Sequence, residues 1–431
     1  MIRYWKFYWP LALTGVAMVL SVQFQNAALA RYPEAVTELA VFALGYSTFG
    51  FFRASLSFIA QLSNVFARST LGTLRCHRFV GFASIVIMSP LLFLGHSQSG
   101  AELLGAIYHI DNTLTARVQE YLIYLAPIIL LGAQRFYYNG LLVQARLTGW
   151  VTLLNVLFLS TVITLLIIGF NLGLRPAVVL VGSEVLAIAV QLLATLWIKH
   201  RYYRPQAQPE HEKLSYRELI NFFIPVSMTG VMFALSRPVL YAFVSRTPEG
   251  LLAIAAMRVA FDFSMLFQQA ANQFRHFFVT FGLDDLAGKR RFMTLVGVGI
   301  TALMLIFAVT PISDLVWRDL MQIPDDARAL AVQVLMVMCL MPAIIIVRNY
   351  YHGRLMVERR TAGMAVASIM RVVGIFLSAQ LLFSLGALNH LSAAAILIFG
   401  FVIETVIVLH AARNGQAANG QAERVKATAK I

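Results

Sequence analysis

The chain has 431 residues, of which 59% are hydrophobic and only 13% are charged, and its formal net charge is +14. So little polar surface could not cover a soluble protein of this length, which excludes the soluble globular class. Apolar runs long enough to cross a bilayer as helices recur along nearly the whole sequence, so most of the chain is expected to lie in lipid.

About twelve membrane-spanning helices are predicted, because the apolar runs are continuous rather than alternating as in barrel strands. In chain order they are residues 8–30, 36–64, 79–95, 119–143, 149–170, 176–198, 219–244, 250–280, 293–312, 329–352, 362–386 and 391–411. The first run is too long for the apolar region of a signal peptide and lacks a convincing cleavage site, so it is interpreted as a retained helix.

Lysine and arginine fall unevenly between these spans. With the N-terminus inside, about 21 of them lie in cytoplasmic segments and about 6 in outer ones, so both termini are predicted to be cytoplasmic. The positive charge is then explained by topology and by contact with anionic lipid, not by nucleic acid. We expect a multi-pass protein of the inner (plasma) membrane with the lipid bilayer, and no nucleic acid, as its partner.

The sequence also repeats itself. Pro10, Thr14, Gly15 and Val16 recur with the same spacing as Pro225, Thr229, Gly230 and Val231. The pattern Arg-x-Tyr-Tyr-x-Gly-x-Leu-x-x-x-Arg-x-Thr fills positions 135–148 and recurs at positions 348–361. These matches define a repeat alignment, in which the second repeat is displaced by 215 residues in the first pattern and by 213 residues in the second. Because each repeat holds six spans and starts inside, the repeats run parallel, related by an axis along the membrane normal.

The predicted fold is therefore an all-α polytopic membrane protein built from two six-helix bundles. The bundles are assigned to residues 1–198 and 218–412, with a cytoplasmic linker at 199–217 and a disordered cytoplasmic tail at 413–431. Two facing bundles leave a central cleft that can open to either side, as alternating access requires.

Several charges lie inside the predicted spans. The arginines are Arg53, Arg135, Arg237, Arg258, Arg275, Arg348 and Arg371, and the few acids are chiefly Glu184, Asp262 and Glu404. A charge near the bilayer centre costs about 3 kcal/mol even on insertion scales, so each arginine needs a partner, a cavity or water. The interior is predicted to be electropositive.

Two polar stripes are candidate cavity linings. The second span carries Arg53, Ser57, Gln61 and Asn64 on one helical face, and the eighth span carries Arg258, Asp262, Gln269, Gln273 and His276 on another. In the repeat alignment, Ser57 and Gln61 correspond to Asn272 and His276. Both repeats are therefore expected to line the same kind of polar surface.

These residues also have structural interpretations. Arg135 and Arg348 lie near the predicted cytoplasmic boundary, which favours snorkelling to the interface. Arg258 either contacts a solute or is neutralised by Asp262 one turn away, whereas Arg53 and Arg237 lie deeper and have no acid at i+4, which favours a solute-facing role. Glu184 and Glu404 are interpreted as bonds between neighbouring helices, and His276 as a polar residue near a helix end.

Catalytic and metal-binding patterns are weak. Gly297-x-Gly299 lacks a third glycine, no phosphate-loop pattern occurs, and His211-Glu212 has no second histidine at zincin spacing. Cys76 and Cys339 fall in different spans at different predicted depths. The sequence predicts no enzyme, no cofactor and no metal site.

Several patches together resemble the progressive ankylosis protein family, a branch of the superfamily that holds multidrug exporters and lipid-linked oligosaccharide flippases. They are Trp9-Pro10-Leu11-x-Leu13-Thr14, Leu44-x-Tyr46-Ser47-x-x-x-Phe51-Phe52, Ser236-Arg237-Pro238, Phe243-Val244-Ser245-Arg246, and Val347-Arg348 with Gly353-x-Leu355-Met356, Thr361, Ser368 and Arg371. The resemblance implies twelve helices in two bundles and export of small polyanions such as pyrophosphate, nucleotide or citrate-like carboxylates. It matches Arg237, Arg348 and Arg371 to family arginines. The first span has no acid and Arg53 stands where the match has no charge, so ion coupling and cargo do not transfer.

We therefore expect a monomeric alternating-access transporter that exports a small organic or phosphate-bearing polyanion. The expected substrate contacts are Arg53, Gln61, Arg237, Arg258, Asn272, His276, Arg348 and Arg371, with Asp262 tuning the charge of Arg258. One alternative is a multidrug or cation antiporter, which would need a buried acid, and another is a flippase for a lipid-linked precursor, which would need a lateral opening. A non-transporting scaffold or receptor is disfavoured, because it would not require arginines on repeated intramembrane faces.

Overall fold

The computed structural model describes residues 2–67, 69–145, 147–203, 214–272, 274, 278, 281, 283–358 and 362–428. Every regular element in these ranges is a helix, and ten helices are long and apolar enough to cross a membrane. Each of the ten overlaps a predicted span, and helices α1 (Ile2–Leu29) and α9 (Tyr216–Val244) lie at the two remaining ones. The all-α, polytopic fold class is confirmed.

The elements of the first repeat are α1, α2 (Ala35–Ala54), η1 (Ser55–Phe58), α3 (Ile59–Phe66), α4 (Thr70–His96), α5 (Gln98–Tyr108), α6 (Asn112–Gln144), α7 (Thr148–Asn171) and α8 (Pro176–Tyr202). Those of the second are α9, α10 (Gly250–Asn272), α12 (Leu286–Val309), α13 (Ile312–Asp314), η2 (Leu315–Leu320), α14 (Asp325–Met338), α15 (Met341–Val357), α16 (Ala362–Ser384) and α17 (His390–Thr428). The short helices α5, α13 and η2 were not predicted, since they are too short to span a bilayer.

Local sequence explains where several helices begin. The side chains of Ser69 and Asp111 accept hydrogen bonds from the free backbone N–H groups of the first turns of α4 and α6. At the start of α9, Ser215 and Glu218 form a reciprocal capping box. Because Ser69 caps it, α4 begins well before the predicted span. The apolar pattern alone did not reveal the polar first turns of this helix.

The second predicted span is not one continuous helix. Residues 55–58 form a 3₁₀ turn, η1, between α2 and α3. A 3₁₀ helix advances about 120° per residue instead of about 100°, so four such residues rotate the following face substantially. The predicted span is therefore interrupted after Arg53, and the polar face predicted for Arg53, Ser57, Gln61 and Asn64 stays a prediction, because the side chains of Ser57, Gln61 and Asn64 lie outside the described part.

The helix boundaries follow the sequence repeat closely. Helix α6 runs from position 112 to 144, and α14 begins and α15 ends at the aligned positions 325 and 357. The ends of α4 and α7, at positions 96 and 171, align in the same way with the ends of α12 and α16, at positions 309 and 384. The internal duplication predicted from scattered identities therefore extends to the secondary structure of nearly every span.

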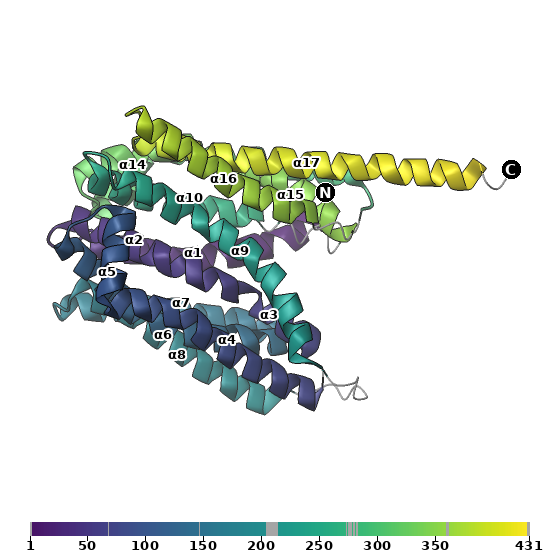
Figure 1. Cartoon of the computed structure of the whole chain (residues 1–431), viewed down its shortest axis with the longest axis horizontal. Helices are drawn as coiled ribbons and strands as arrows, with labels where there is room; N and C mark the ends of the chain where they lie inside the picture. Colours follow the sequence, from purple (N-terminus) through teal and green to yellow (C-terminus); the bar gives the residue numbers. More distant parts are fainter. Residues whose placement is uncertain are drawn as a thin grey trace. The chain divides into compact units, whose positions relative to one another are not determined.

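Packing repeats as well. In the first repeat, α6 packs on α4 and α8, and α7 packs on α8 (Figure 1). The corresponding helices α15, α12, α17 and α16 make the same set of contacts. One apolar cluster contains Leu142, Leu154 and Ile198, and the other contains the equivalent positions Leu355 and Ala367 with Ala411 packed against them.

Outer loops carry a further pair of equivalent contacts. Arg31, just after α1, donates to the backbone oxygen of Leu320 at 2.7 Å. Its counterpart Arg246, just after α9, donates to the backbone oxygens of Ala106 and Ile107 at 3.2 and 3.3 Å. The repeat alignment pairs Leu320 with Ile107, so each arginine reaches the same position of the other repeat's short outer helix.

Contacts divide the chain into two compact units. The C-terminal unit comprises Met1–Val19, Val259–Leu315 and Ala329–Ile431, and the N-terminal unit comprises Leu20–Arg258 and Val316–Arg328. The first part of α1 thus packs within the C-terminal unit, where Tyr8 stacks on Phe274 with ring centroids 4.5 Å apart. The sequence-based division into bundles, linker and disordered tail stays a prediction.

A close approach at equivalent glycines should make both sites intolerant of a side chain. A Cβ on Gly140 of α6 would clash with Oγ of Ser63, and one on Gly353 of α15 would clash with the ring of Phe278, whereas nothing lies within 4 Å of the corresponding position on Gly132. We expect Gly140→Ala and Gly353→Ala to lower the free energy of unfolding by roughly 1–3 kcal/mol through overpacking.

Gly132→Ala, on the same helix as Gly140, is the matched control. It should leave stability unchanged or raise it by up to about 1 kcal/mol, because alanine is the better helix former. Thermal unfolding of the purified proteins in detergent measures all three, and equal melting temperatures for Gly140→Ala and Gly132→Ala would contradict the close packing of α6 on α3.

Candidate functional site

Three buried polar clusters occupy the interior of the two units. The Glu404 cluster comprises Asn272, Arg348, His352, Ser368, Arg371 and Glu404, from α10, α15, α16 and α17 of the C-terminal unit. The Gln191 cluster comprises Arg135, Asn155 and Gln191, from α6, α7 and α8 of the N-terminal unit. The Arg53 cluster comprises Gln25, Asn26, Tyr46, Arg53, Glu184 and Arg258 of the same unit.

Glu404 is the centre of its cluster. Its Oε2 accepts from Nη1 of Arg371 at 2.5 Å and from Nη1 of Arg348 at 3.4 Å. The side chains of Arg371, Arg348 and Glu404 are 1%, 5% and 2% exposed, so water does not screen these ion pairs. One carboxylate therefore holds two guanidinium groups from two neighbouring helices.

The remaining polar atoms of the cluster face the same carboxylate or Arg348. Oε1 of Glu404 accepts from the Ser368 hydroxyl at 3.5 Å and lies 3.7 Å from Nε2 of His352. Nη2 of Arg348 donates to the Asn272 side chain at 3.2 Å. Such a network satisfies a buried carboxylate because both α15 and α16 contribute donors to it, while Asn272 of α10 accepts from Arg348.

The Gln191 cluster is the first-repeat equivalent. Nη1 of Arg135 donates to Oε1 of Gln191 at 3.0 Å, and Nε2 of Gln191 donates to Oδ1 of Asn155 at 3.2 Å. In the repeat alignment these three positions correspond to Arg348, Glu404 and Ser368. The sequence repeat therefore places an arginine of α6 or α15 against a polar residue of α8 or α17 in both halves.

The two equivalents differ in charge. Gln191 stands where the second repeat has Glu404, and Phe158 stands where it has Arg371. The guanidinium carbon of Arg135 lies 5.5 Å from the centroid of the Phe158 ring, a cation–π contact in the place of a second arginine. Compared with the Gln191 cluster, the Glu404 cluster has one additional arginine and one additional acid. Each of these two clusters therefore has one more arginine than acid.

The Arg53 cluster joins α1, α2 and α8. Nη1 of Arg53 lies 3.5 Å from Oε1 of Glu184 and donates to the Tyr46 hydroxyl at 3.1 Å. The same carboxylate accepts from Tyr46 at 3.4 Å and from Gln25 at 3.5 Å. Glu184 therefore bonds side chains of neighbouring helices, as the sequence analysis expected.

Arg258 completes this cluster from α10. Its Nε donates to Oδ1 of Asn26 at 2.9 Å, and its guanidinium carbon lies 4.2 Å from the Phe42 ring centroid and 5.7 Å from that of Tyr46. Tyr46 therefore contacts both Arg53 and Arg258.

The structure brings some predicted site residues together and separates others. Asn272, Arg348 and Arg371 meet at Glu404, and Arg53 and Arg258 meet at Tyr46. Arg237 lies half-buried on α9 and Asp262 is buried on α10. The side chains of Gln61 and His276, like Arg275 and Gln273, fall outside the described part of the chain.

One interpretation of the sequence is wrong. Arg135 and Arg348 were expected to snorkel to the cytoplasmic interface, yet both are only 4% exposed. Their guanidinium groups turn to partners on α8 and α17 instead, because a buried charge-assisted hydrogen bond is available there. Proximity to a predicted span end did not reveal these partners.

Sequence reasoning also missed Gln191, Asn155 and the role of Tyr46. The uncharged Gln191 gave no signal in a search for intramembrane charges. Applying the repeat alignment to Glu404 would have found it, since the alignment carries Glu404 onto Gln191 and Ser368 onto Asn155. Tyr46 gave no comparable signal, because aromatic residues are common throughout membrane helices.

Transplanting the first-repeat arrangement tests the equivalence of the clusters. Glu404→Gln leaves two buried arginines without their carboxylate and should lower the free energy of unfolding by about 3 kcal/mol or more. Adding Arg371→Phe rebuilds the Arg135, Gln191 and Phe158 pattern in the second repeat, so the double variant should recover most of that loss.

Thermal unfolding in detergent measures both variants against wild type and against Arg371→Phe alone. The single Arg371→Phe variant keeps the Arg348–Glu404 ion pair, so it is expected to be at least as stable as the double variant, in which Arg348 faces a neutral amide. Strictly additive losses in the double variant would show that the two clusters are not interchangeable.

Comparisons with known proteins find one matching family model and several solved structures of the same fold. The model of the family described as progressive ankylosis protein (ANKH) matches residues 1–198. The lipid II flippase MurJ, in an inward closed conformation, aligns with a TM-score of 0.63 at 14% identity, covering 93% of this chain and 87% of that chain. An inward-facing multidrug resistance MATE family transporter of the MOP superfamily aligns with a TM-score of 0.64 at 14% identity, covering 95% of each chain.

A third similar structure is a MOP superfamily transporter from Pyrococcus furiosus, described as having a binding pocket of reverse polarity. It aligns with a TM-score of 0.56 at 11% identity and covers 95% of both chains. At these identities the structures show a shared fold. The chain is therefore similar to the progressive ankylosis protein family over its first 198 residues, and it shares the fold of these membrane proteins over nearly its whole length.

Proposed function

We propose that the chain is an alternating-access transporter that exports a small organic or phosphate-bearing polyanion, of the size of citrate, pyrophosphate or a nucleotide. The observation that carries this proposal is the repeated excess of buried arginine. The equivalent Gln191 and Glu404 clusters each hold one more arginine than carboxylate. Uncompensated positive charge in a low-dielectric interior attracts an anion strongly.

Arg53 is the best placed of these arginines to touch a solute. Its side chain is 32% exposed, whereas those of Arg348 and Arg371 are 5% and 1% exposed. Its pairing with Glu184 at 3.5 Å is longer than a close ion pair, so an incoming carboxylate or phosphate can take the place of Glu184. A guanidinium group can grip either anion bidentately, which a lysine cannot.

The Glu404 cluster acts differently in this proposal. Arg348 and Arg371 are already engaged by Glu404 and are enclosed, so they hold α15, α16 and α17 together and contribute positive potential rather than direct contact. The Nε atoms of both Arg135 and Arg348 are buried without a hydrogen-bond partner among the described residues. Both equivalent arginines thus keep unused donor capacity for a rearranged conformation.

A cation antiporter fits these contacts less well. It would need a buried carboxylate available to a cationic drug or a coupling ion, and Glu184 and Glu404 both face arginine. Asp262 is the remaining buried acid named from the sequence. The anion proposal therefore accounts for more of the observed charge than the cation proposal does.

Ligand-induced thermal stabilisation tests the proposal directly. Purified protein in detergent is heated with citrate, pyrophosphate or ATP, each compared with chloride at equal ionic strength, since a ligand that binds the folded state raises the melting temperature. We expect at least one polyanion to stabilise wild type, and Arg53→Ala to weaken its apparent affinity at least tenfold.

Arg53→Lys and Arg175→Ala are the matched variants. The first keeps the charge but loses the planar fork, so it should bind with intermediate affinity, and the second removes an outer arginine whose side chain is 82% exposed and should bind as wild type does. Flux of the stabilising anion is then measured in proteoliposomes. Stabilisation by lipophilic cations and by none of the anions would overturn the proposal in favour of a multidrug antiporter.

A further inference from the structure

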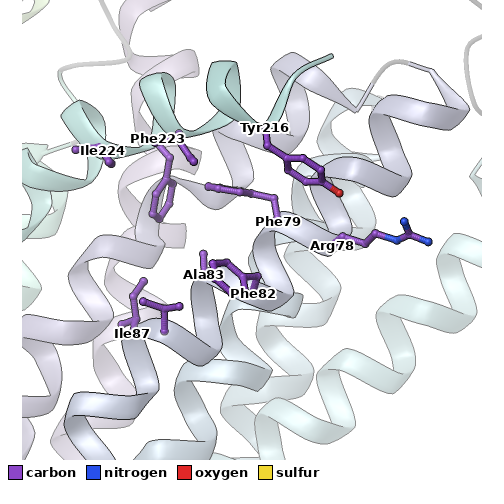
Figure 2. Close-up of a pocket in the computed structure, with 10 residues that line it drawn as sticks. Arg78, Phe79, Phe82, Ala83, Ile87, Tyr216, Phe223 and Ile224 are labelled. Atoms are coloured by element: carbon purple, nitrogen blue, oxygen red, sulfur yellow. The ribbon is translucent and has the colours of Figure 1, made fainter. Parts of the chain in front are cut away.

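An apolar groove runs between α4 and α9 in the N-terminal unit, and none of its lining residues belongs to the three polar clusters. Its volume is about 560 Å³, and its walls include Phe79, Phe82 and Ile87 from α4 and Ile220, Phe223 and Ile224 from α9 (Figure 2). Phe79 and Phe223 form the buried floor, with ring centroids 5.6 Å apart.

The rim of the groove is apolar but exposed. Phe82 is 68% exposed, Ile224 56% and Ile220 43%. Both helices start on the cytoplasmic side and enter the bilayer, so these side chains face lipid tails rather than water. An acyl chain is therefore the apolar material available to fill the groove.

One end of the groove is polar. Figure 2 shows the guanidinium group of Arg78 and the hydroxyl of Tyr216 pointing to the same side, away from Phe223 and Ile224. Arg78 lies near the cytoplasmic end of α4, and Tyr216 is the first residue of α9. Arg75 lies three residues before Arg78, and Arg217 directly follows Tyr216, so both add positive charge at the level of lipid headgroups.

The sequence repeat explains why the groove exists on this helix pair. In the repeat alignment, Ile220 and Ile224 correspond to Trp5 and Trp9, and Phe223 corresponds to Tyr8. At the equivalent place in the C-terminal unit, Trp5 packs edge-on against Phe292 at 5.4 Å and lies 6.4 Å from Trp9. Two indole rings thus stand at the positions that two isoleucines hold beside the groove between α4 and α9.

From these observations we infer that the groove between α4 and α9 binds one anionic phospholipid of the cytoplasmic leaflet. One acyl chain lies along Phe79, Phe223 and the isoleucines, and the phosphate is held by Arg78 with Tyr216 as a second donor. The occupant ties the first helix of the second repeat to the third helix of the first. A guanidinium group beside a phenolic hydroxyl matches a phosphodiester in both charge and hydrogen bonding.

Native mass spectrometry of the full chain measures this binding. The protein is purified with an equimolar mixture of phosphatidylglycerol and phosphatidylethanolamine, and the lipid retained after detergent exchange is counted. Wild type should retain one phosphatidylglycerol in preference to phosphatidylethanolamine, and Arg78→Ala should retain at least fivefold less.

Two further variants come from the repeat itself. Arg291 is the exposed equivalent of Arg78 on α12, so Arg291→Ala removes the same charge outside the groove between α4 and α9 and should retain lipid as wild type does. Ile220→Trp with Ile224→Trp copies the first repeat into the groove and should displace the lipid while leaving the melting temperature unchanged or higher.

Some results would overturn the inference. Equal loss of lipid in Arg78→Ala and Arg291→Ala would mean that the arginines attract only a nonspecific lipid annulus. Full retention in the tryptophan variant would place the lipid elsewhere, and equal retention of both headgroups by wild type would rule out an anionic specificity. If the double tryptophan variant does not fold, Ile220→Trp alone is measured in its place.

Discussion

Arginine inside a bilayer can be tolerated only where the fold supplies it with a partner, and this requirement shapes both repeats. In each of them an arginine on the long fourth span meets a polar residue on the sixth span, as Arg135 meets Gln191 and Arg348 meets Glu404. Because leaving either guanidinium group unpaired would cost several kcal/mol, these contacts fix how α6 lies against α8 and α15 against α17. The equivalent apolar clusters beside them then pack around an already defined helix orientation.

Duplication preserved this geometry while the chemistry diverged. The second repeat has a carboxylate and a second arginine where the first has an amide and a phenyl ring, and the net charge of the two clusters stays the same. An amide suffices for one arginine, whereas Glu404 balances two and draws in His352 and Ser368. The same backbone therefore carries a dense ion-pair network in one half and a lighter hydrogen-bonded arrangement in the other. The fold fixes where interior side chains lie, whereas the side chains themselves set the polarity of the interior. Structures of the same fold can therefore have low sequence identity to this chain.

The first helix of each repeat shows a related asymmetry. At the cytoplasmic end of α1, Tyr8 packs against Phe292 of α12, and at that of α9, Phe223 packs against Phe79 of α4, so each of these helices contacts the third helix of the other repeat. The contacts are equivalent, yet tryptophans flank one of them and isoleucines flank the other, which adjoins the apolar groove. In the proposed transporter, movement of the repeats relative to each other would break or slide such contacts, so the lipid site that we propose between α4 and α9 lies at a contact between the two repeats.

The sequence by itself determined the features that depend on short stretches of chain. The spans, the topology and the repeat could be predicted because apolar runs, Lys/Arg distribution and spaced identities are local patterns that the bilayer acts on directly. The excess of interior arginine was equally visible. The partners of these arginines could not be predicted. Arg135 and Gln191 are 56 residues apart, as are Arg348 and Glu404, and only the rotation and packing of helices brings them within bonding distance. The 3₁₀ turn after α2, the enclosure of Arg348 and the groove beside Arg78 were likewise decided by tertiary structure, because each depends on which face one helix presents to another.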